Sequence, residues 1–170
     1  MSALRVDDGA KAGTQCGPLI NASAVEKVAS LVDDAVSKGA VVLTGGNSPD
    51  RVGYFYSPTV LINVPANADL LKEEIFGPVA PIVVFDHEDE AVDAANATEY
   101  GLVAYVFTGD IARGMRISER LESGMIGLNR GIVSDPAAPF GGVKQSGLGR
   151  EGAHHGMLEF MEAKYISVNW

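Results

Sequence analysis

From Ala80 to Asn129 the chain alternates between short apolar runs and segments with one apolar face. Three runs are predicted strands: Ala80–Phe85, Leu102–Thr108 and Met125–Asn129. Two segments between them are predicted helices: Glu88–Ala97, with Asp86 as its cap, and Ile111–Glu122, with Asp110 as its cap. Strands that alternate with helices pair in parallel through right-handed crossovers. The pattern predicts an α/β fold with a mostly parallel sheet and crossover helices, in which Leu102–Thr108 is buried on both faces.

The flanking parts add elements of both kinds. Apolar residues recur at helical spacing from Val25 to Val36, with Asn21 or Ser23 as the cap and Gly39 as the stop. Two further strands are predicted over Ala40–Thr44 and Pro58–Val64. A helix over 150–159 and a last strand over Lys164–Trp170 complete the prediction, and no linker composition divides the chain.

Composition restricts the functional classes. The chain has 170 residues, enough for one domain with a core, and is 46% apolar and 21% charged. Its net charge of -9 argues against nucleic acids and anionic membrane surfaces as partners. The sequence shows neither a signal peptide nor an apolar run of the ~20 residues that span a bilayer. Cys16 is the single cysteine, so no internal disulfide forms and a reducing, cytoplasmic location is expected.

A glycine-rich stretch follows Pro139. Gly141, Gly142, Gly147 and Gly149 could bring backbone N–H groups to an anion at a helix start. Lys144 stands too far before the helix for a phosphate-binding loop of the Walker type, and prolines stand where the dinucleotide motif needs a strand. The pattern therefore favours a tight turn packed against a neighbouring segment.

The candidate chemical groups are also better explained structurally. Glu73 and Glu74 are adjacent and would diverge by ~100° in a helix, so they do not form a catalytic pair. Cys16 has no neighbouring histidine or basic cluster to activate it. His154 and His155 are adjacent rather than four apart, and His87 stands at a solvated helix start, so no metal site is expected.

Several motifs, in this order and spacing, resemble the C-terminal part of the aldehyde dehydrogenase superfamily over almost the whole chain. The main ones are Lys72–Val79 and Pro139–Glu151, joined by Thr14–Ile20, Gly53–Phe55, Pro58–Val60 and Asn96–Leu102. The segment Gly124–Trp170 looks most like succinate-semialdehyde dehydrogenases. The resemblance implies a partial catalytic domain over 1–160 and an oligomerisation strand over 161–170, hence a homo-oligomer. It also implies that the nucleophilic cysteine, the activating glutamate, the oxyanion-binding asparagine and the cofactor domain precede Met1, leaving this chain inactive alone.

The same resemblance implies roles for four residues. Glu74 matches a glutamate that accepts hydrogen bonds from the nicotinamide ribose, and Phe76 matches an aromatic beside the nicotinamide of NAD or NADP. Phe140 matches the aromatic wall of the aldehyde tunnel. Ser134 falls where succinate-semialdehyde dehydrogenases bind the substrate carboxylate. Asn129 matches a structural asparagine.

Two other interpretations stay open. The chain could derive from an aldehyde dehydrogenase of another specificity, which depends on whether Ser134 contacts a carboxylate. It could instead be a stand-alone binding or assembly module that pairs through an open sheet edge.

Overall fold

Asn21 begins the first helix of the chain in the computed structural model, which describes residues 1–170. Its side chain accepts a hydrogen bond from the backbone N–H of Ala24 at 2.9 Å, so a helix donor that would lack a partner is satisfied. Helix α1 runs over Ala22–Ser37, and Gly39 follows with a φ of 114°. The predicted cap and the predicted stop are both confirmed.

The structure divides into two units, Met1–Val84 and Phe85–Trp170, although no linker composition marks the boundary. The first contains α1, a three-stranded sheet and the short 3₁₀ helix η1 over Asp69–Leu71. The second contains α2 to α4 and two small two-stranded sheets.

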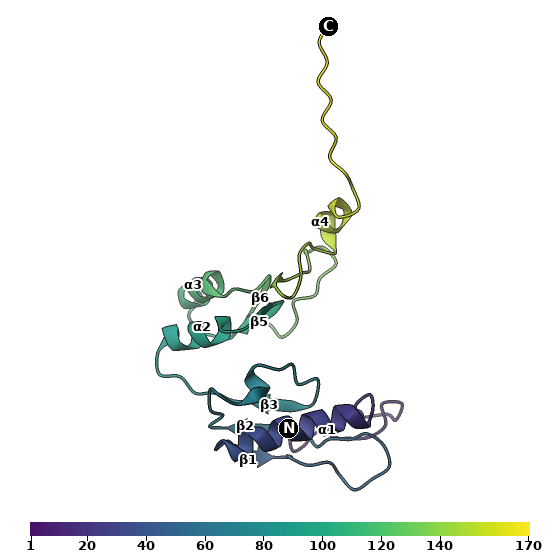
Figure 1. The fold of residues 1–170 in the computed structure, drawn as a ribbon, viewed down its shortest axis with the longest axis vertical. Coiled ribbons are helices and arrows are strands. Elements are labelled where there is room, and N and C mark those ends of the chain that lie inside the picture. The colour runs from purple at the N-terminus through teal and green to yellow at the C-terminus, as the bar shows by residue number, and fades with distance from the viewer. The chain divides into compact units, whose positions relative to one another are not determined.

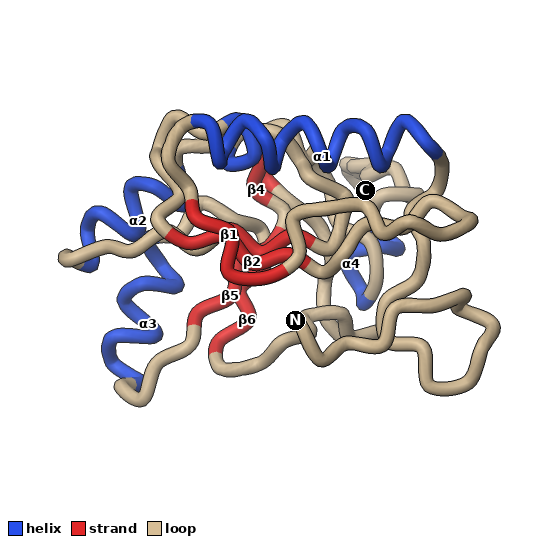
Figure 2. Tube along the Cα trace, turned by 90° about the horizontal axis from the view of Figure 1, so that it is seen from below, coloured by secondary structure: helices blue, strands red, loops and turns tan.

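The sheet of the first unit is mixed. Strand β1 (Val41–Thr44) pairs antiparallel with β2 (Thr59–Ile62), and β2 pairs in parallel with β3 (Val79–Pro81). Helix α1 lies along this sheet in both views (Figures 1 and 2). The apolar stripe of α1 enters the core, where it meets residues from β2 and the loops: Val28, Leu31, Val32, Ala35, Tyr56, Leu61, Val64 and Leu70.

The first unit buries two polar side chains, Thr59 and Tyr56. The Thr59 hydroxyl donates to the Ser57 carbonyl at 2.7 Å and accepts from the Gly46 N–H at 2.8 Å. Burial of the phenol raises the pKa of Tyr56 to about 12, and the negative charge of Asp33 adds to the effect. Tyr56 therefore stays neutral and anchors the core.

The second unit contains the predicted parallel crossover. Strand β5 (Val103–Val106) leads into α3 (Ile111–Arg120), which returns to β6 (Met125–Leu128), and β5 and β6 pair in parallel from Val103 to Val106. Asp110 caps α3, because its carboxylate accepts from the N–H groups of Ala112 and Arg113 at 2.9 and 3.1 Å. The prediction for this crossover is confirmed.

Helix α2 (Glu88–Asn96) packs beside α3 through ion pairs. Glu88 bonds the guanidinium of Arg116 through both carboxylate oxygens, at 3.0 and 2.8 Å, and Arg120 contacts Asp89 at 2.7 Å. The hydrogen bond from Arg116 holds the pKa of Glu88 below its usual range. Strand β4 (Tyr100–Gly101) pairs antiparallel with β7 (Val143–Lys144), and α4 covers Ala153–Leu158.

Several predictions about the elements were wrong. The sheets are small and mixed rather than mostly parallel, because β1 returns antiparallel to β2 and β4 pairs antiparallel with β7. Strand β3 ends at Pro81, so the predicted strand over Ala80–Phe85 is short, although the N–H of Ile82 still donates to the carbonyl of Leu61 at 2.9 Å.

Three details of the second unit also differ from the sequence predictions. His87, not Asp86, occupies the N-cap position of α2, without a side-chain bond. Strand β5 is not buried on both faces, since Tyr105 is 45% exposed. The segment 161–170 has no regular structure, because a strand needs a hydrogen-bonding partner (Figure 1). No helix combines the length and apolar character required to cross a bilayer.

Candidate functional site

The segment Glu73–Gly77 presents an acidic and an aromatic side chain to solvent in the first unit. It lies between η1 and β3. Glu74 is exposed, and the Phe76 side chain is 76% exposed, although large aromatic rings favour burial. Between them, Ile75 packs against the core. The segment is therefore anchored through Ile75 and projects the two residues that flank it.

Helix α1 holds this segment in place. The ammonium of Lys27 donates to the backbone carbonyl of Glu74 at 2.8 Å and lies 3.9 Å from the carboxylate of Glu73. A Cβ at Gly77 would lie 2.6 Å from Cγ2 of Val28, so only glycine allows this approach to α1. The side chain of Glu74 is left available, because the lysine binds its backbone rather than its carboxylate.

An ion pair and a hydrogen bond hold η1, which precedes Glu73–Gly77, against the end of α1. Lys38 at the end of α1 forms ion pairs with Asp34 at 2.7 Å and with Asp69 of η1 at 3.0 Å. The backbone N–H of Asp69 donates to Asp34, and this bond, followed by the one from Lys38, lowers the pKa of the Asp34 carboxyl. Helix η1 thus joins α1 and sets the start of Glu73–Gly77.

This arrangement suits a nucleoside-type ligand. An exposed carboxylate accepts hydrogen bonds from vicinal hydroxyl groups, and an exposed ring offers its face or edge to a flat heterocycle. Phe76 has a φ of 45°, a conformation that costs energy for a residue with a Cβ. Such strain persists where the surroundings impose it, and it often accompanies functional positions. Glu74 and Phe76 therefore fit the cofactor roles that the resemblance implies.

Ser134 and Phe140 lie in the second unit, on the connection between β6 and β7. Ser134 is exposed, and its hydroxyl makes no hydrogen bond to another residue. A turn follows, in which Asp135 accepts from the N–H groups of Ala137 and Ala138 at 2.9 and 3.0 Å. Phe140 is half-buried and exchanges two backbone hydrogen bonds of 2.8 Å with Glu151. The serine is thus free to bind a ligand, while the aromatic is fixed.

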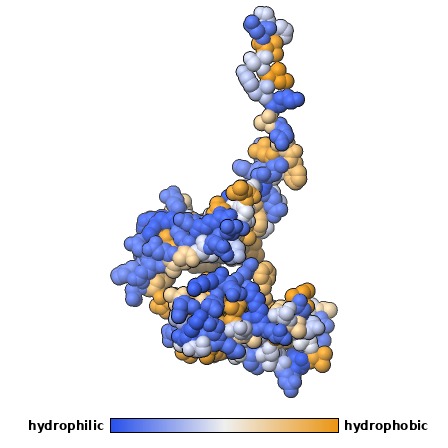
Figure 3. All heavy atoms as spheres, in the orientation of Figure 1, coloured by the Kyte–Doolittle hydropathy of each residue, from blue (hydrophilic) through white to orange (hydrophobic).

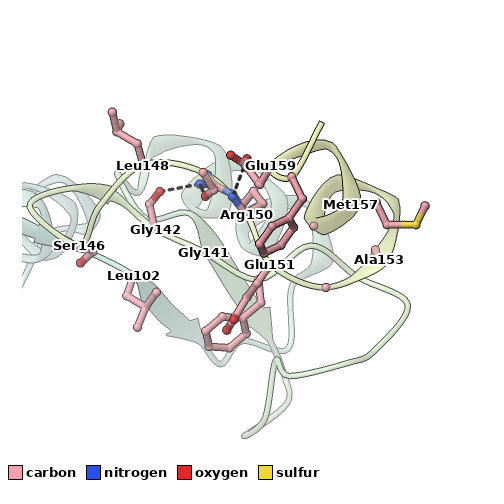
Figure 4. Close-up of a pocket in the computed structure, with 15 residues that line it drawn as sticks. Leu102, Gly141, Gly142, Ser146, Leu148, Arg150, Glu151, Ala153, Met157 and Glu159 are labelled. Atoms are coloured by element: carbon pink, nitrogen blue, oxygen red, sulfur yellow. Dashed lines mark hydrogen bonds between the residues drawn. The ribbon is translucent and has the colours of Figure 1, made fainter. Parts of the chain in front are cut away.

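Phe140 borders a pocket of about 670 Å³ in this unit. Figure 4 shows this pocket, with Gly141, Gly142 and Arg150 among its labelled lining residues. The pocket lies between residues 141–150, called here the glycine loop, and α4. A Cβ at Gly141 would lie 2.6 Å from the Gly149 carbonyl, and one at Gly142 would lie 2.6 Å from Cβ of Ser146. The glycines therefore allow close backbone packing, and the interpretation of this stretch as a tight turn is confirmed.

The remaining candidates show no catalytic arrangement. The Cys16 thiol lies 3.8 Å from the carbonyl of Gly17. No group of three or more histidine, cysteine, aspartate or glutamate side chains is arranged to hold a metal ion. Glu73 and Glu74 are exposed and follow η1 rather than lie within a helix.

Comparison with known proteins agrees with the motifs. The model of the aldehyde dehydrogenase family matches residues 1–166. The chain belongs to the aldehyde dehydrogenase family. Succinate-semialdehyde dehydrogenase from Paenarthrobacter nicotinovorans is 52% identical over 168 residues, which make up 99% of this chain and 37% of the relative. The NADP-dependent succinate-semialdehyde dehydrogenase of Escherichia coli is 47% identical, over 99% of this chain and 35% of its own length.

A solved aldehyde dehydrogenase fold matches as well. The crystal structure of succinate-semialdehyde dehydrogenase from Burkholderia pseudomallei superposes with a TM-score of 0.90 and 50% identity, and it covers 92% of this chain and 33% of that chain. The chain thus spans about a third of the length of the relatives it matches.

Sequence reasoning overlooked the groups that hold the family motifs in place. Lys27 contacts a carbonyl 47 positions away, a separation that no local pattern reveals. The sequence suggests for Lys144 only a place in a phosphate-binding pattern, yet its ammonium contacts the end of α2, 48 positions away. The carbonyl groups that these two lysines bind come close to them only in the folded chain, so no sequence signal identifies either contact.

Proposed function

We propose that this chain is part of the catalytic domain of an NAD- or NADP-dependent dehydrogenase that oxidises succinate semialdehyde to succinate. The observation that carries the proposal is the outward projection of Glu74 and Phe76 from an anchored segment in a chain of this family. The identity of 52% to a succinate-semialdehyde dehydrogenase supports the substrate. A cytoplasmic location and a homo-oligomer, joined through 161–170, complete the proposal.

The chain's own residues bind and orient rather than form covalent bonds. The Glu74 carboxylate accepts hydrogen bonds from the ribose of the cofactor, and Phe76 packs beside the nicotinamide. When bound, the cofactor supplies the acceptor for hydride. Phe140 forms an apolar wall for the aldehyde chain, and the hydroxyl of Ser134 donates a hydrogen bond to the distant carboxylate of the substrate.

We further propose that the 170 residues alone oxidise no aldehyde. Cys16 is the single cysteine, and no histidine or other base contacts its thiol to generate a thiolate nucleophile. A chimera restores the context: residues 1–170 replace the aligned third of the E. coli enzyme. The chimera should oxidise succinate semialdehyde with NAD or NADP, and the isolated chain should not. An isolated chain whose turnover is abolished by Cys16→Ser would refute the proposal, as would a folded but inactive chimera.

A second substrate has a specific observation in its favour. A protein from Pseudomonas aeruginosa named glutarate-semialdehyde dehydrogenase is 47% identical over 97% of this chain, the same identity as for the E. coli enzyme. Both substrates carry a terminal carboxylate and differ by one methylene, which a pocket discriminates by only ~1–3 kcal/mol. The ratio of kcat/KM for the two semialdehydes, measured on the chimera, decides between them.

A further inference from the structure

Lys144 joins three separate segments of the second unit. Its ammonium donates to the carbonyl of Asn96 at 2.8 Å and to the carbonyl of Thr98 at 3.1 Å, and it forms an ion pair with Glu122. Asn96 is the last residue of α2. A positive charge at the C-terminal end of a helix satisfies carbonyls that lack a partner within the helix. The lysine side chain is 25% exposed, and its bonds to the two carbonyls lie at the surface.

The end of α2 is itself tied to the end of α3. The side chain of Asn96 donates to the carbonyl of Arg120 at 2.9 Å and accepts from the N–H of Glu122 at 2.8 Å. Glu122 in turn forms the ion pair with Lys144. The Lys144 ammonium therefore binds where the ends of α2 and α3 are already joined by the Asn96 side chain.

The backbone around Lys144 is fixed to the same region. Lys144 has a φ of 54°, which is unfavourable for a residue with a side chain. The next residue, Gln145, donates its N–H to the carbonyl of Glu99 at 2.9 Å, and the Ser146 hydroxyl accepts from the N–H of Gly101 at 3.0 Å. The side-chain contacts of Lys144 offset the strain and hold this part of the glycine loop against 96–101.

The glycine loop connects Lys144 with Phe140. At its base, Phe140 and Glu151 exchange two hydrogen bonds. Within it, the Arg150 guanidinium donates to the carbonyl of Gly142 at 2.7 Å (Figure 4). Gly141 and Gly142 pack so closely that neither accommodates a Cβ. Because the stretch between Lys144 and Phe140 is closely packed at Gly141 and Gly142, a displacement at Lys144 is transmitted to Phe140.

We propose that Lys144 is a positioning residue of the aldehyde site: its ammonium fixes the glycine loop to the ends of α2 and α3, and thereby fixes Phe140 as the wall of that site. The role in binding the aldehyde rests on the proposed function. The attachment of the glycine loop to the ends of α2 and α3 by Lys144, called here the clamp, rests on contacts within the second unit and is tested separately.

The clamp is tested by amide hydrogen exchange on the 170-residue chain. Lys144→Met should accelerate exchange at Gly101 and Gln145 by at least tenfold, while amides of α1 stay unchanged. Lys11→Met is the matched control, since Lys11 is an exposed lysine paired with Asp7 alone, and it should leave both amides unaffected. Unchanged exchange at both amides in Lys144→Met overturns the clamp. If Lys144→Met does not fold, Glu122→Gln decides, with accelerated exchange at the same amides supporting the clamp and unchanged exchange overturning it.

The positioning role is tested by kinetics on the chimera. Lys144→Met should raise KM about tenfold for succinate semialdehyde and for an uncharged aldehyde of similar length, because an apolar wall serves both. KM for the cofactor should stay within twofold, and Lys144→Arg, which keeps the charge, should recover most of the loss.

Each kinetic outcome separates the two claims. A lower kcat with unchanged KM values, or equal rises for aldehyde and cofactor, overturns the positioning role while leaving the proposed function intact. A folded chimera that oxidises no aldehyde refutes the proposed function and the positioning role with it, and the exchange experiment then still decides the clamp.

Discussion

Phe76 combines an exposed aromatic ring with a left-handed backbone, and its neighbours explain why. Ile75 turns into the core, and Gly77 packs against Val28 of α1, so the residue between them must adopt an unfavourable φ of 45°. A glycine would take this conformation without strain. The presence of phenylalanine therefore costs stability and indicates that the ring serves another purpose.

Two substitutions at this residue separate strain from function. Phe76→Gly and Phe76→Ala both remove the ring, but only Ala keeps the strain of a Cβ at positive φ. We expect the Gly variant to be more stable than the Ala variant by about 1 kcal/mol. Urea unfolding of the isolated chain measures the difference. An Ala variant as stable as the Gly variant would contradict the strain, and in the chimera both variants should raise KM for the cofactor alike.

Among single residues, the sequence offers candidate ligand-binding side chains but not the residues that hold them in place. Glu74, Phe76, Ser134 and Phe140 stand in motifs that are read directly from the chain. The residues that hold them in place cannot be read from the sequence. Lys27 reaches the Glu74 carbonyl, and Lys144 reaches the Asn96 carbonyl, only after folding brings these segments together. Which of the four residues contact ligand stays a prediction.

Among the elements, α3 depends most clearly on one capping residue. Asp110 accepts two backbone N–H bonds at the start of the helix. Both bonds lower the pKa of the Asp110 carboxyl from the ordinary 3.8, and the bond from the Arg113 N–H has the larger effect. A lowered pKa in the folded state means that the stabilisation is complete above pH 3.8 and is lost as the pH falls through the folded value.

Asp110→Ala should therefore lower the melting temperature by a few degrees near neutral pH. The difference from the unmodified chain should shrink as the pH falls below 4, where the carboxyl becomes protonated. Asp110→Asn keeps an acceptor oxygen without the charge, so it should retain part of the cap and lose the pH dependence. Thermal unfolding across pH measures both effects. A constant difference between pH 7 and pH 3 would show that the charge has no role.

Elements with strong local signals and the parallel pairing of β5 with β6 were predicted, but the antiparallel pairings of β1 with β2 and of β4 with β7 were not. Helix α1 carries a cap, an apolar face and a stop, α3 carries a cap, and β5 and β6 are continuous apolar runs. The direction of β1 relative to β2 depends on how the turn-rich segment 45–57 returns, which composition does not encode. Asp86 resembled a cap by residue type, but its backbone N–H bonds Glu90 instead.

For the whole molecule, exposed apolar side chains predict self-association. Leu148 and Phe160 are more than nine-tenths exposed, and hydrophobic side chains follow along 161–170 (Figure 3). Surfaces of this kind mark interaction sites, and an extended segment pairs readily with a sheet edge. Sedimentation should show association that rises with concentration, and deletion of 161–170 should weaken it. A strictly monomeric chain at high concentration would contradict this expectation and the proposed homo-oligomer.

The central claim for the whole molecule is that it handles an aldehyde with a distant carboxylate, and Ser134 tests it most directly. A charge-assisted hydrogen bond is worth ~1.5–3 kcal/mol, so Ser134→Ala in the chimera should lower kcat/KM for succinate semialdehyde by about one to two powers of ten. An uncharged aldehyde of similar length should lose less than about twofold. Ser146→Ala is the comparison, since that hydroxyl bonds Gly101 within the protein and should affect both aldehydes alike. Equal losses for the two aldehydes in Ser134→Ala would contradict the account.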